Sequence, residues 1–153
     1  MNALIAHAQS KGIDPVILNS VMDTNENQPR QMLALLKKHL DPHGRTIGVL
    51  GLAFKPDTDD IRESRAIPVI RLLLQGGAIV KAYDPVAMAH FKKVFPGISY
   101  AASSAEVLAA DAVLIVTEWK EFESLDYRGK LVIDGRRIER ARAEAAVYEG
   151  MCW

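Results

Sequence analysis

The sequence has little of what several protein classes need. It contains a single cysteine, Cys152, so an internal disulfide and a multi-cysteine metal site are excluded. Its four histidines lack ligand spacing, and no metal site is expected. No apolar run approaches the roughly 20 residues that span a bilayer. The amino terminus also lacks the features of a secretory signal, so a cytoplasmic protein is expected.

The chain also lacks an excess of either charge, with 19 Lys and Arg against 19 Asp and Glu. A net charge of zero gives no overall attraction to nucleic acid or to an anionic membrane, and neither is an expected partner. Hydrophobic residues make up 49% and charged residues 25% of the 153-residue chain. This composition and length are typical of a globular protein with a substantial core.

The first 40 residues have helical spacing. Asp14-Pro15 is typical of a helix start, and apolar residues recur at helical intervals on both sides of Pro29. We expect two helices, or one kinked helix, over roughly 15–40, ended by the turn residues that begin at Asp41. Residues 1–41 are therefore predicted to form a helical arm, and residues 45–153 a separate α/β domain.

From residue 45 onward, short apolar runs alternate with helical segments. Strands are predicted at 46–50, 78–84, 98–101, 112–117 and 130–134. Helices are predicted at 64–75, with Gly76 as its stop, at 85–94, and after a capping box of Ser103 and Glu106. Apolar strands separated by helices indicate the α/β class, here a Rossmann-like open parallel sheet with helices on both faces.

Ligands of open α/β sheets bind beyond the carboxyl ends of the strands. This rule selects the loop 51–62, Asp84-Pro85, the segment 117–119 and the turn 134–137. Asp84 is either a ribose-binding acid or a helix cap. Gly48-x-x-Gly51 lacks the spacing G-x-G-x-x-G, which disfavours an independent NAD-binding domain and favours a glycine that is needed for a tight turn.

Two of these segments carry cations suited to phosphate or carboxylate. Lys55 and Arg62 lie among four acids in residues 54–64, where the alternatives are a solvated charged loop or a Mg²⁺ site built from the loop aspartates. Arg136 and Arg137 follow the last predicted strand, where an arginine pair suits a diphosphate, or belongs to the surface of a turn. Residue types alone leave these alternatives open.

Several motifs together resemble one family. The run IGVLGLAFKPDTDDIRES (47–64) is similar to the start of the C-terminal domain of UDP-glucose/GDP-mannose dehydrogenases. The likeness continues through 76–85, 110–112, 117–119 and 134–136, and residues 21–28 resemble the end of the family's central helix. The segment FKPDTDD favours the UDP-glucose branch over the GDP-mannose branch.

The resemblance implies that this chain is the C-terminal, nucleotide-sugar-binding domain of an NAD-dependent enzyme, which oxidises UDP-glucose to UDP-glucuronate. The family's catalytic cysteine and lysine and its NAD domain have no counterpart in this sequence. We therefore expect a fragment that is inactive alone, with no catalytic residue of its own. Phe54, Lys55 and Arg136 match positions that contact the UDP-sugar, Arg137 is adjacent, and Arg62 matches a position that reaches toward NAD.

The same resemblance bears on assembly. The family's central helix lies at a dimer interface, so a homodimer through the arm is expected. The alternative function is a non-catalytic oligomerisation module with a vestigial ligand site, in which the arm associates and the strand-end residues bind nothing. Binding of a UDP-sugar distinguishes the two hypotheses.

Overall fold

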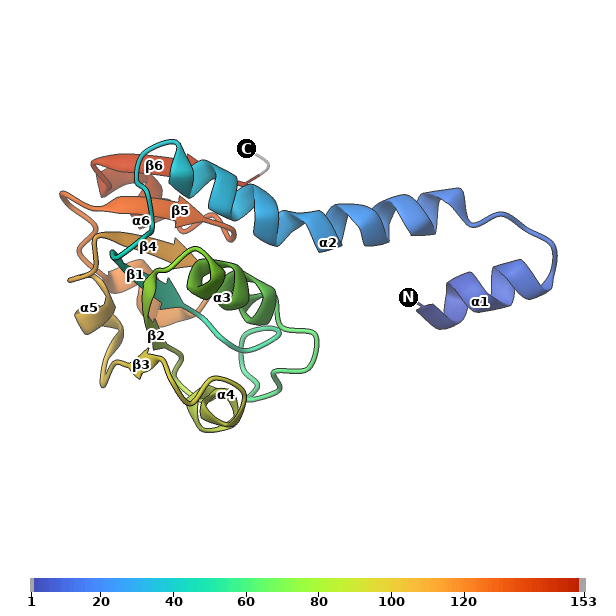
Figure 1. The fold of residues 1–153 in the computed structure, drawn as a ribbon, viewed down its shortest axis with the longest axis horizontal. Coiled ribbons are helices and arrows are strands. Elements are labelled where there is room, and N and C mark those ends of the chain that lie inside the picture. The colour runs from blue at the N-terminus through green and yellow to red at the C-terminus, as the bar shows by residue number, and fades with distance from the viewer. Residues whose placement is uncertain (1, 152–153) are drawn as a thin grey trace.

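A computed structural model describes residues 2–151, so Cys152 lies outside the described residues. The sheet consists of β1 (Thr46–Leu50), β2 (Ile79–Tyr83), β3 (Ser99–Tyr100), β4 (Ala112–Ile115), β5 (Leu131–Asp134) and β6 (Val147–Gly150). The strand order is β3-β2-β1-β4-β5-β6, and every pair of neighbours is parallel (Figure 1). This order confirms the predicted Rossmann-like α/β fold.

The helices occur between the strands and before them. They are α1 (Asn2–Ser10), α2 (Val16–Lys37), α3 (Ala66–Gln75), α4 (Met88–Val94), α5 (Ser104–Val107), the 3₁₀ helix η1 (Lys120–Ser124) and α6 (Glu139–Glu144). Most of α2 and all of α1 project away from the sheet as an arm (Figure 1). No helix within residues 2–151 is long and apolar enough to cross a membrane.

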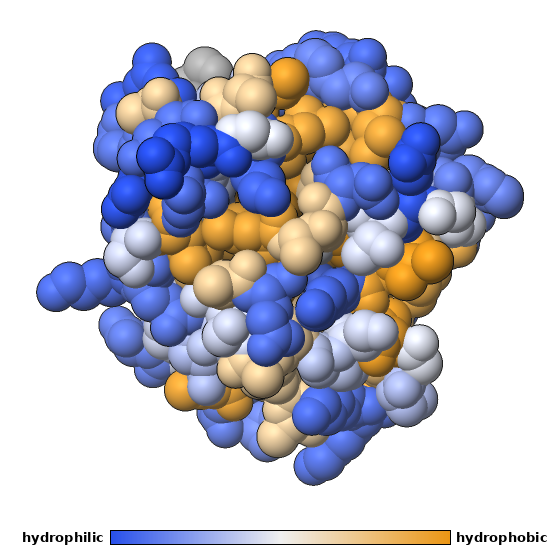
Figure 2. Space-filling view, turned by 90° about the vertical axis from the view of Figure 1, so that its left-hand side faces the viewer, coloured by the Kyte–Doolittle hydropathy of each residue, from blue (hydrophilic) through white to orange (hydrophobic). Residues whose placement is uncertain are grey.

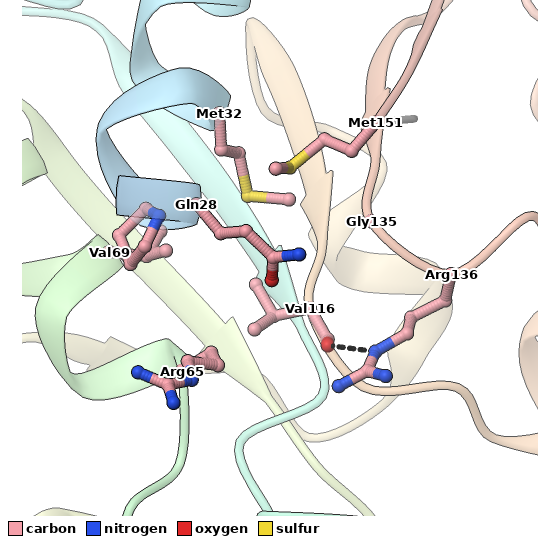
Figure 3. A pocket seen from close by; sticks show the side chains of 9 residues that line it. Gln28, Met32, Arg65, Val69, Val116, Gly135, Arg136 and Met151 are labelled. Carbon is pink, nitrogen blue, oxygen red and sulfur yellow. Dashed lines mark hydrogen bonds between the residues drawn. The ribbon is translucent and has the colours of Figure 1, made fainter. Parts of the chain in front are cut away.

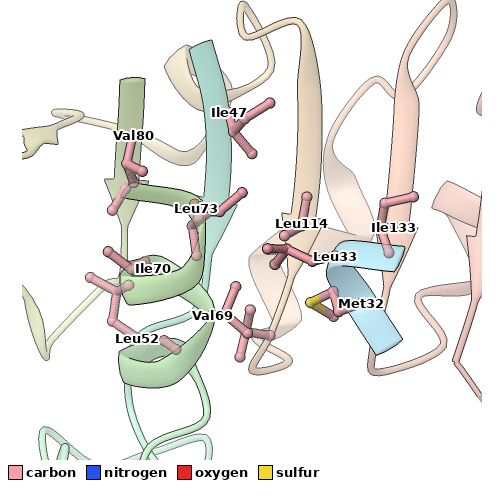
Figure 4. Close-up of a cluster of buried hydrophobic side chains, with 14 of the residues drawn as sticks. Met32, Leu33, Ile47, Leu52, Val69, Ile70, Leu73, Val80, Leu114 and Ile133 are labelled. Carbon is pink, nitrogen blue, oxygen red and sulfur yellow. The ribbon is translucent and has the colours of Figure 1, made fainter. Parts of the chain in front are cut away.

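Two hydrophobic cores cover the two faces of the sheet. On one face, α3 packs Val69, Ile70 and Leu73 against Ile47 and Val80 (Figure 4). On the other face, α5, η1 and α6 bury a second cluster that contains Val107, Phe122 and Ala141. Because both faces are covered, the central strands are apolar on both sides, which is why they are readable as continuous apolar runs.

The carboxyl-terminal third of α2 belongs to the first core. Met32, Leu33 and Leu36 are buried, and Figure 4 shows Met32 and Leu33 beside Leu114 and Ile133 of β4 and β5. The arm therefore covers the half of this face that α3 does not reach. The predicted domain division at residues 41–45 stays a prediction, with this packing contact across it.

Pro29 does not divide the arm into two helices, so of the two expected arrangements the single helix is the one present. A single helix runs from Val16 to Lys37, with Pro29 inside it and buried. Proline removes one helical hydrogen bond at a cost of about 3 kcal/mol, which burial of its ring and of the following turn against the sheet offsets here. Asp14 makes no capping bond either, because the helix begins one residue later, after Pro15.

Other differences from the predicted elements lie at polar or short segments. Four elements were not predicted as separate helices or strands: α1, η1, α6 and β6. The four residues of β6 are only partly buried or exposed. The Ser103 side chain forms no cap, and Glu106 accepts from the N–H of Ala102 instead, so the predicted capping box is wrong. Gly76 does end α3, as predicted.

The end of the domain opposite the arm offers no single apolar face. Apolar groups reach the surface there in several places among hydrophilic ones (Figure 2). Ile79 and Val147, the first residues of β2 and β6, are among the exposed large hydrophobic residues. The polar and charged segments with predicted roles lie at the other end, where the strands finish.

Candidate functional site

The four segments selected at the strand ends do meet, and Asp84 holds three of them together. Its Oδ2 accepts the N–H groups of Leu52 and Ala53 at 2.7 and 3.0 Å and the indole N–H of Trp119 at 3.1 Å. Its Oδ1 accepts two further N–H groups, at 3.0 and 2.8 Å, from the turn before α4. Asp84 is fully buried, so it caps and joins protein segments instead of binding ribose.

The loops that follow β1 and β4 also touch each other directly. The Thr117 hydroxyl donates to the carbonyl of Ala53 at 2.6 Å, and Gly51 lies against the backbone of Thr117 with a φ of +86°. Protein therefore fills the point where the strand order reverses, which is where a dinucleotide binds in a Rossmann fold. Gly51 serves this close contact, in agreement with the predicted tight turn.

A second buried carboxylate ends β5. The Oδ1 of Asp134 accepts the N–H groups of Arg136 and Arg137 at 2.7 and 3.0 Å, and its Oδ2 accepts the N–H of Ile138 and the hydroxyl of Tyr148. Burial raises the pKa of Asp134, and these hydrogen bonds act in the opposite direction. The carboxylate fixes the turn from which both arginine side chains project.

A pocket opens beside this turn, between α2, α3 and the ends of β4, β5 and β6 (Figure 3). Its volume is about 120 Å³. Its polar lining residues are Gln28, Arg65 and Arg136, and its apolar ones include Met32, Val69 and Met151. Pockets for whole small molecules have volumes of about 300–1,000 Å³, so this one holds only a part of such a ligand.

Arg136 is the predicted site residue that lines this pocket. Its Nε donates to the carbonyl of Val116 at 2.6 Å and lies 3.2 Å from Oε2 of Glu118 (Figure 3). These contacts hold the side chain by one edge, which leaves the terminal guanidinium nitrogens for a ligand. A guanidinium oriented in this way is suited to a planar, two-point contact with phosphate or carboxylate.

The other predicted residues lie outside the pocket lining. Phe54 and Lys55 are exposed in the loop after β1, and Arg137 is exposed and 3.1 Å from Glu139. Arg62 is 88% exposed, and its guanidinium forms a two-point contact with Asp60. Hydrogen bonds from Arg62 lower the pKa of Asp60 to about 2.

The acids of the loop after β1 therefore hold the side chain of Arg62 in place. Asp60 also accepts the backbone N–H of Arg62 at 2.9 Å, and Asp59 lies 3.7 Å from His90 of α4. Among residues 2–151, no three His, Cys, Asp or Glu side chains are placed to hold a metal ion, so the Mg²⁺ alternative has no geometric support.

Gln28 and Arg65 are the polar pocket residues that the sequence did not predict as site residues. Arg65 precedes α3, three residues beyond the loop 51–62 that was selected, and Gln28 lies on the arm, next to Pro29. Figure 3 shows the Gln28 carboxamide between the two arginines. The available signal was an arginine at the start of the helix after β1. Gln28 ends the run 21–28 that resembles the family's central helix, but its residue type gave no sign of a binding role.

The strand order defines a doubly wound, Rossmann-like α/β domain, and an arginine turn lies at the edge of its strand-end pocket. The family model for the UDP-glucose/GDP-mannose dehydrogenase family, UDP binding domain, matches residues 48–141. The chain therefore belongs to the UDP-glucose/GDP-mannose dehydrogenase family, as its motifs indicated.

Relatives with assigned names agree with this membership. The chain is 49% identical over 155 aligned residues to the UDP-glucose 6-dehydrogenase AglM of Haloferax volcanii, covering 97% of this chain and 36% of that protein. It is 37% identical to the UDP-glucose 6-dehydrogenase of Rhizobium meliloti, covering 90% of this chain and 34% of the relative. The chain thus spans about a third of the length of the curated relatives it matches.

A solved structure has the same fold across nearly the whole chain. The UDP-glucose dehydrogenase of the hyperthermophilic archaeon Pyrobaculum islandicum superimposes with a TM-score of 0.94 at 45% identity, covering 99% of this chain and 35% of that one. The likeness includes the arm, since it extends well beyond the residues 48–141 that the family model matches.

Proposed function

We propose that this chain supplies the nucleotide-sugar-binding part of an NAD-dependent UDP-glucose 6-dehydrogenase, which oxidises UDP-glucose to UDP-glucuronate. The observation that carries the proposal is the Arg136 turn at the edge of a strand-end pocket. The buried Asp134 holds the backbone of Arg136 there, and the carbonyl of Val116 holds its guanidinium. Phe54, Lys55 and Arg137 are proposed to contact the same ligand. Cytoplasmic location stays a prediction.

The described residues of this chain are suited to contact NAD at one point, but they do not form a complete NAD-binding site. The turn after β1 carries no glycine-rich phosphate loop, and α3 begins only at Ala66, well after β1 ends at Leu50. Bound NAD⁺ would supply the hydride acceptor for the oxidation. Arg62, exposed and oriented by Asp60, is the proposed residue that reaches toward the cofactor from this side.

Calorimetric titration of the chain with UDP tests this proposal. We expect weak binding, with loss of affinity of about ten- to a hundredfold in Lys55→Gln and Arg136→Gln variants, because each removes a charge-assisted hydrogen bond worth about 1.5–3 kcal/mol. Arg45→Gln is the matched control. Arg45 is exposed, immediately precedes β1 and lies at the opposite end of the sheet.

Two results contradict the proposal. One is an absence of UDP binding to the unaltered chain at millimolar concentration. The other is binding in which the perturbed backbone amides, mapped by NMR, cluster near His90 or on the projecting part of the arm before residue 26, and in which both variants bind as the unaltered chain does. The first result favours the alternative of a module whose ligand site is vestigial, and the second places the UDP site elsewhere on the chain.

We also propose that the arm forms a homodimer contact. Val16, Ile17 and Val21 are 59%, 79% and 39% exposed on α2, and they line a shallow groove on its projecting part. Exposed apolar stripes on a helix are stabilised by burial against another surface. A second copy of the arm offers the same stripe, which suits a symmetric contact.

Sedimentation equilibrium checks the dimer. An Ile17→Glu variant is expected to raise the dimer dissociation constant at least about tenfold, because burying a carboxylate in an apolar contact costs more than 1.4 kcal/mol. Asn19→Glu adds the same charge about 200° further around the helix and serves as the control. Equal weakening by both variants, or a monomeric unaltered chain, would show that this stripe is not the contact.

A further inference from the structure

We propose that Arg65 and Gln28 complete an oxyanion subsite with Arg136, which takes a phosphoryl group of a nucleotide diphosphate. The inference rests on the proposed function in one respect, the nucleotide sugar that carries the phosphoryl group. It adds two binding residues, one from the start of α3 and one from the arm.

Unbalanced charge is the first argument. Two arginines line one pocket, and none of its described lining residues is acidic. Glu118 is the nearby carboxylate, and it contacts the Nε edge of Arg136. Arg65 forms no ion pair or side-chain hydrogen bond within residues 2–151, so its charge has no partner among the described residues. A concave site of one charge sign concentrates ions of the opposite sign.

The surroundings strengthen this attraction. Met32, Val69 and Met151 are buried and form apolar walls around the polar groups. Charge-assisted hydrogen bonds are stronger where the local dielectric constant is low. The pocket volume of about 120 Å³ is smaller than the roughly 300–1,000 Å³ of pockets for whole small molecules, and it suits a single tetrahedral oxyanion as part of a larger ligand.

Gln28 links this subsite to the arm. Its carboxamide lies between the two arginines in Figure 3 and makes no hydrogen bond within the described chain. An amide N–H₂ donates to a phosphoryl oxygen without adding charge. A ligand that contacts both Gln28 and Arg136 therefore bridges α2 and the β5 turn, so binding is expected to hold the arm against the domain.

Titration of the full chain with inorganic pyrophosphate, followed by NMR and calorimetry, tests the subsite. We expect the amides of Val69 and Gly135 to shift, and Arg65→Gln to weaken binding at least about tenfold, with partial recovery in Arg65→Lys. Arg71→Gln is the matched control, because Arg71 is exposed on α3, the helix that Arg65 precedes, and does not line the pocket. Gln28→Leu is expected to weaken binding several-fold.

The outcomes separate this inference from the proposed function. No pyrophosphate binding, shifts centred on residues 54–62, or equal effects of Arg65→Gln and Arg71→Gln would overturn the subsite. UDP binding that Arg65→Gln leaves unchanged would overturn it too, while the proposed function would stand. Pyrophosphate binding in the pocket with no tighter binding of UDP would support the subsite and contradict the nucleotide-sugar function. Equal binding of glucuronate would reassign the subsite to a carboxylate and overturn the phosphoryl assignment.

Discussion

An Asp84→Ala variant is expected to lose about 4 kcal/mol or more of its free energy of unfolding. The substitution removes the acceptor of five hydrogen bonds, four of them from backbone N–H groups at the ends of β1 and β2. Each buried donor left without a partner costs about 1–3 kcal/mol. Small domains are stable by only about 5–15 kcal/mol, so a urea melt followed by circular dichroism shows the loss directly.

Asp41→Ala is the control for this variant. Asp41 is exposed and accepts one backbone N–H, from His43 at 3.1 Å. Its removal is expected to cost less than about 1 kcal/mol. A loss from Asp84→Ala as small as that of the control would mean that water replaces the carboxylate at little cost, and the description of Asp84 as the join between strand-end loops would then be wrong.

The two buried aspartates explain how a charged strand end is kept rigid. Asp84 and Asp134 close the turns after β2 and β5, and in each case both carboxylate oxygens accept from protein donors. Neither carboxylate is left for a ligand. Asp134 accepts the backbone N–H of Arg136 and so fixes the turn, while the guanidinium of Arg136 stays available for a ligand. Positioning and binding are therefore carried out by different residues.

The sequence allowed the central sheet to be predicted because its strands are buried on both faces. β1, β4 and β5 appear as continuous apolar runs, whereas β6 at the edge of the sheet has one apolar residue and one tyrosine among four residues, too few to indicate a strand. Pro29 suggested a break that burial against the sheet overrides. Local sequence patterns were thus sufficient to predict strands that are buried on both faces. They failed at β6 and Pro29, where packing against the rest of the fold determines the structure.

The candidate site divides in the same way. Arg136 was predictable because it follows a strand in sequence and the carboxyl ends of parallel strands share one edge. The pocket beside it is built from residues near 28, 65, 116, 135 and 151, which only packing brings together. The sequence likewise offered a cap or a ribose ligand for Asp84, and could not show that the N–H groups of Leu52 and Ala53, more than 30 residues away, occupy it.

A Gly51→Ala variant is expected to lose at least about 3 kcal/mol of its free energy of unfolding. An added methyl group would overlap the carbonyl oxygen of Thr117 and lie 2.6 Å from the Thr117 nitrogen, both of which belong to the backbone and cannot rotate away. The φ of +86° adds about 1–2 kcal/mol of strain for any residue with a Cβ atom. Chemical denaturation measures the sum.

Gly44→Ala isolates the clash from the strain. Gly44 has a φ of +70°, and nothing lies within 4 Å of the added methyl group, so only the backbone term of about 1 kcal/mol is expected there. The difference between the two variants is the cost of separating the loops after β1 and β4. Since those loops carry Phe54 and the Val116 carbonyl that orients Arg136, Gly51→Ala is also expected to weaken UDP binding, and Gly44→Ala is not. Equal losses of stability in the two variants would show that the loops move apart freely and that their contact does not shape the site.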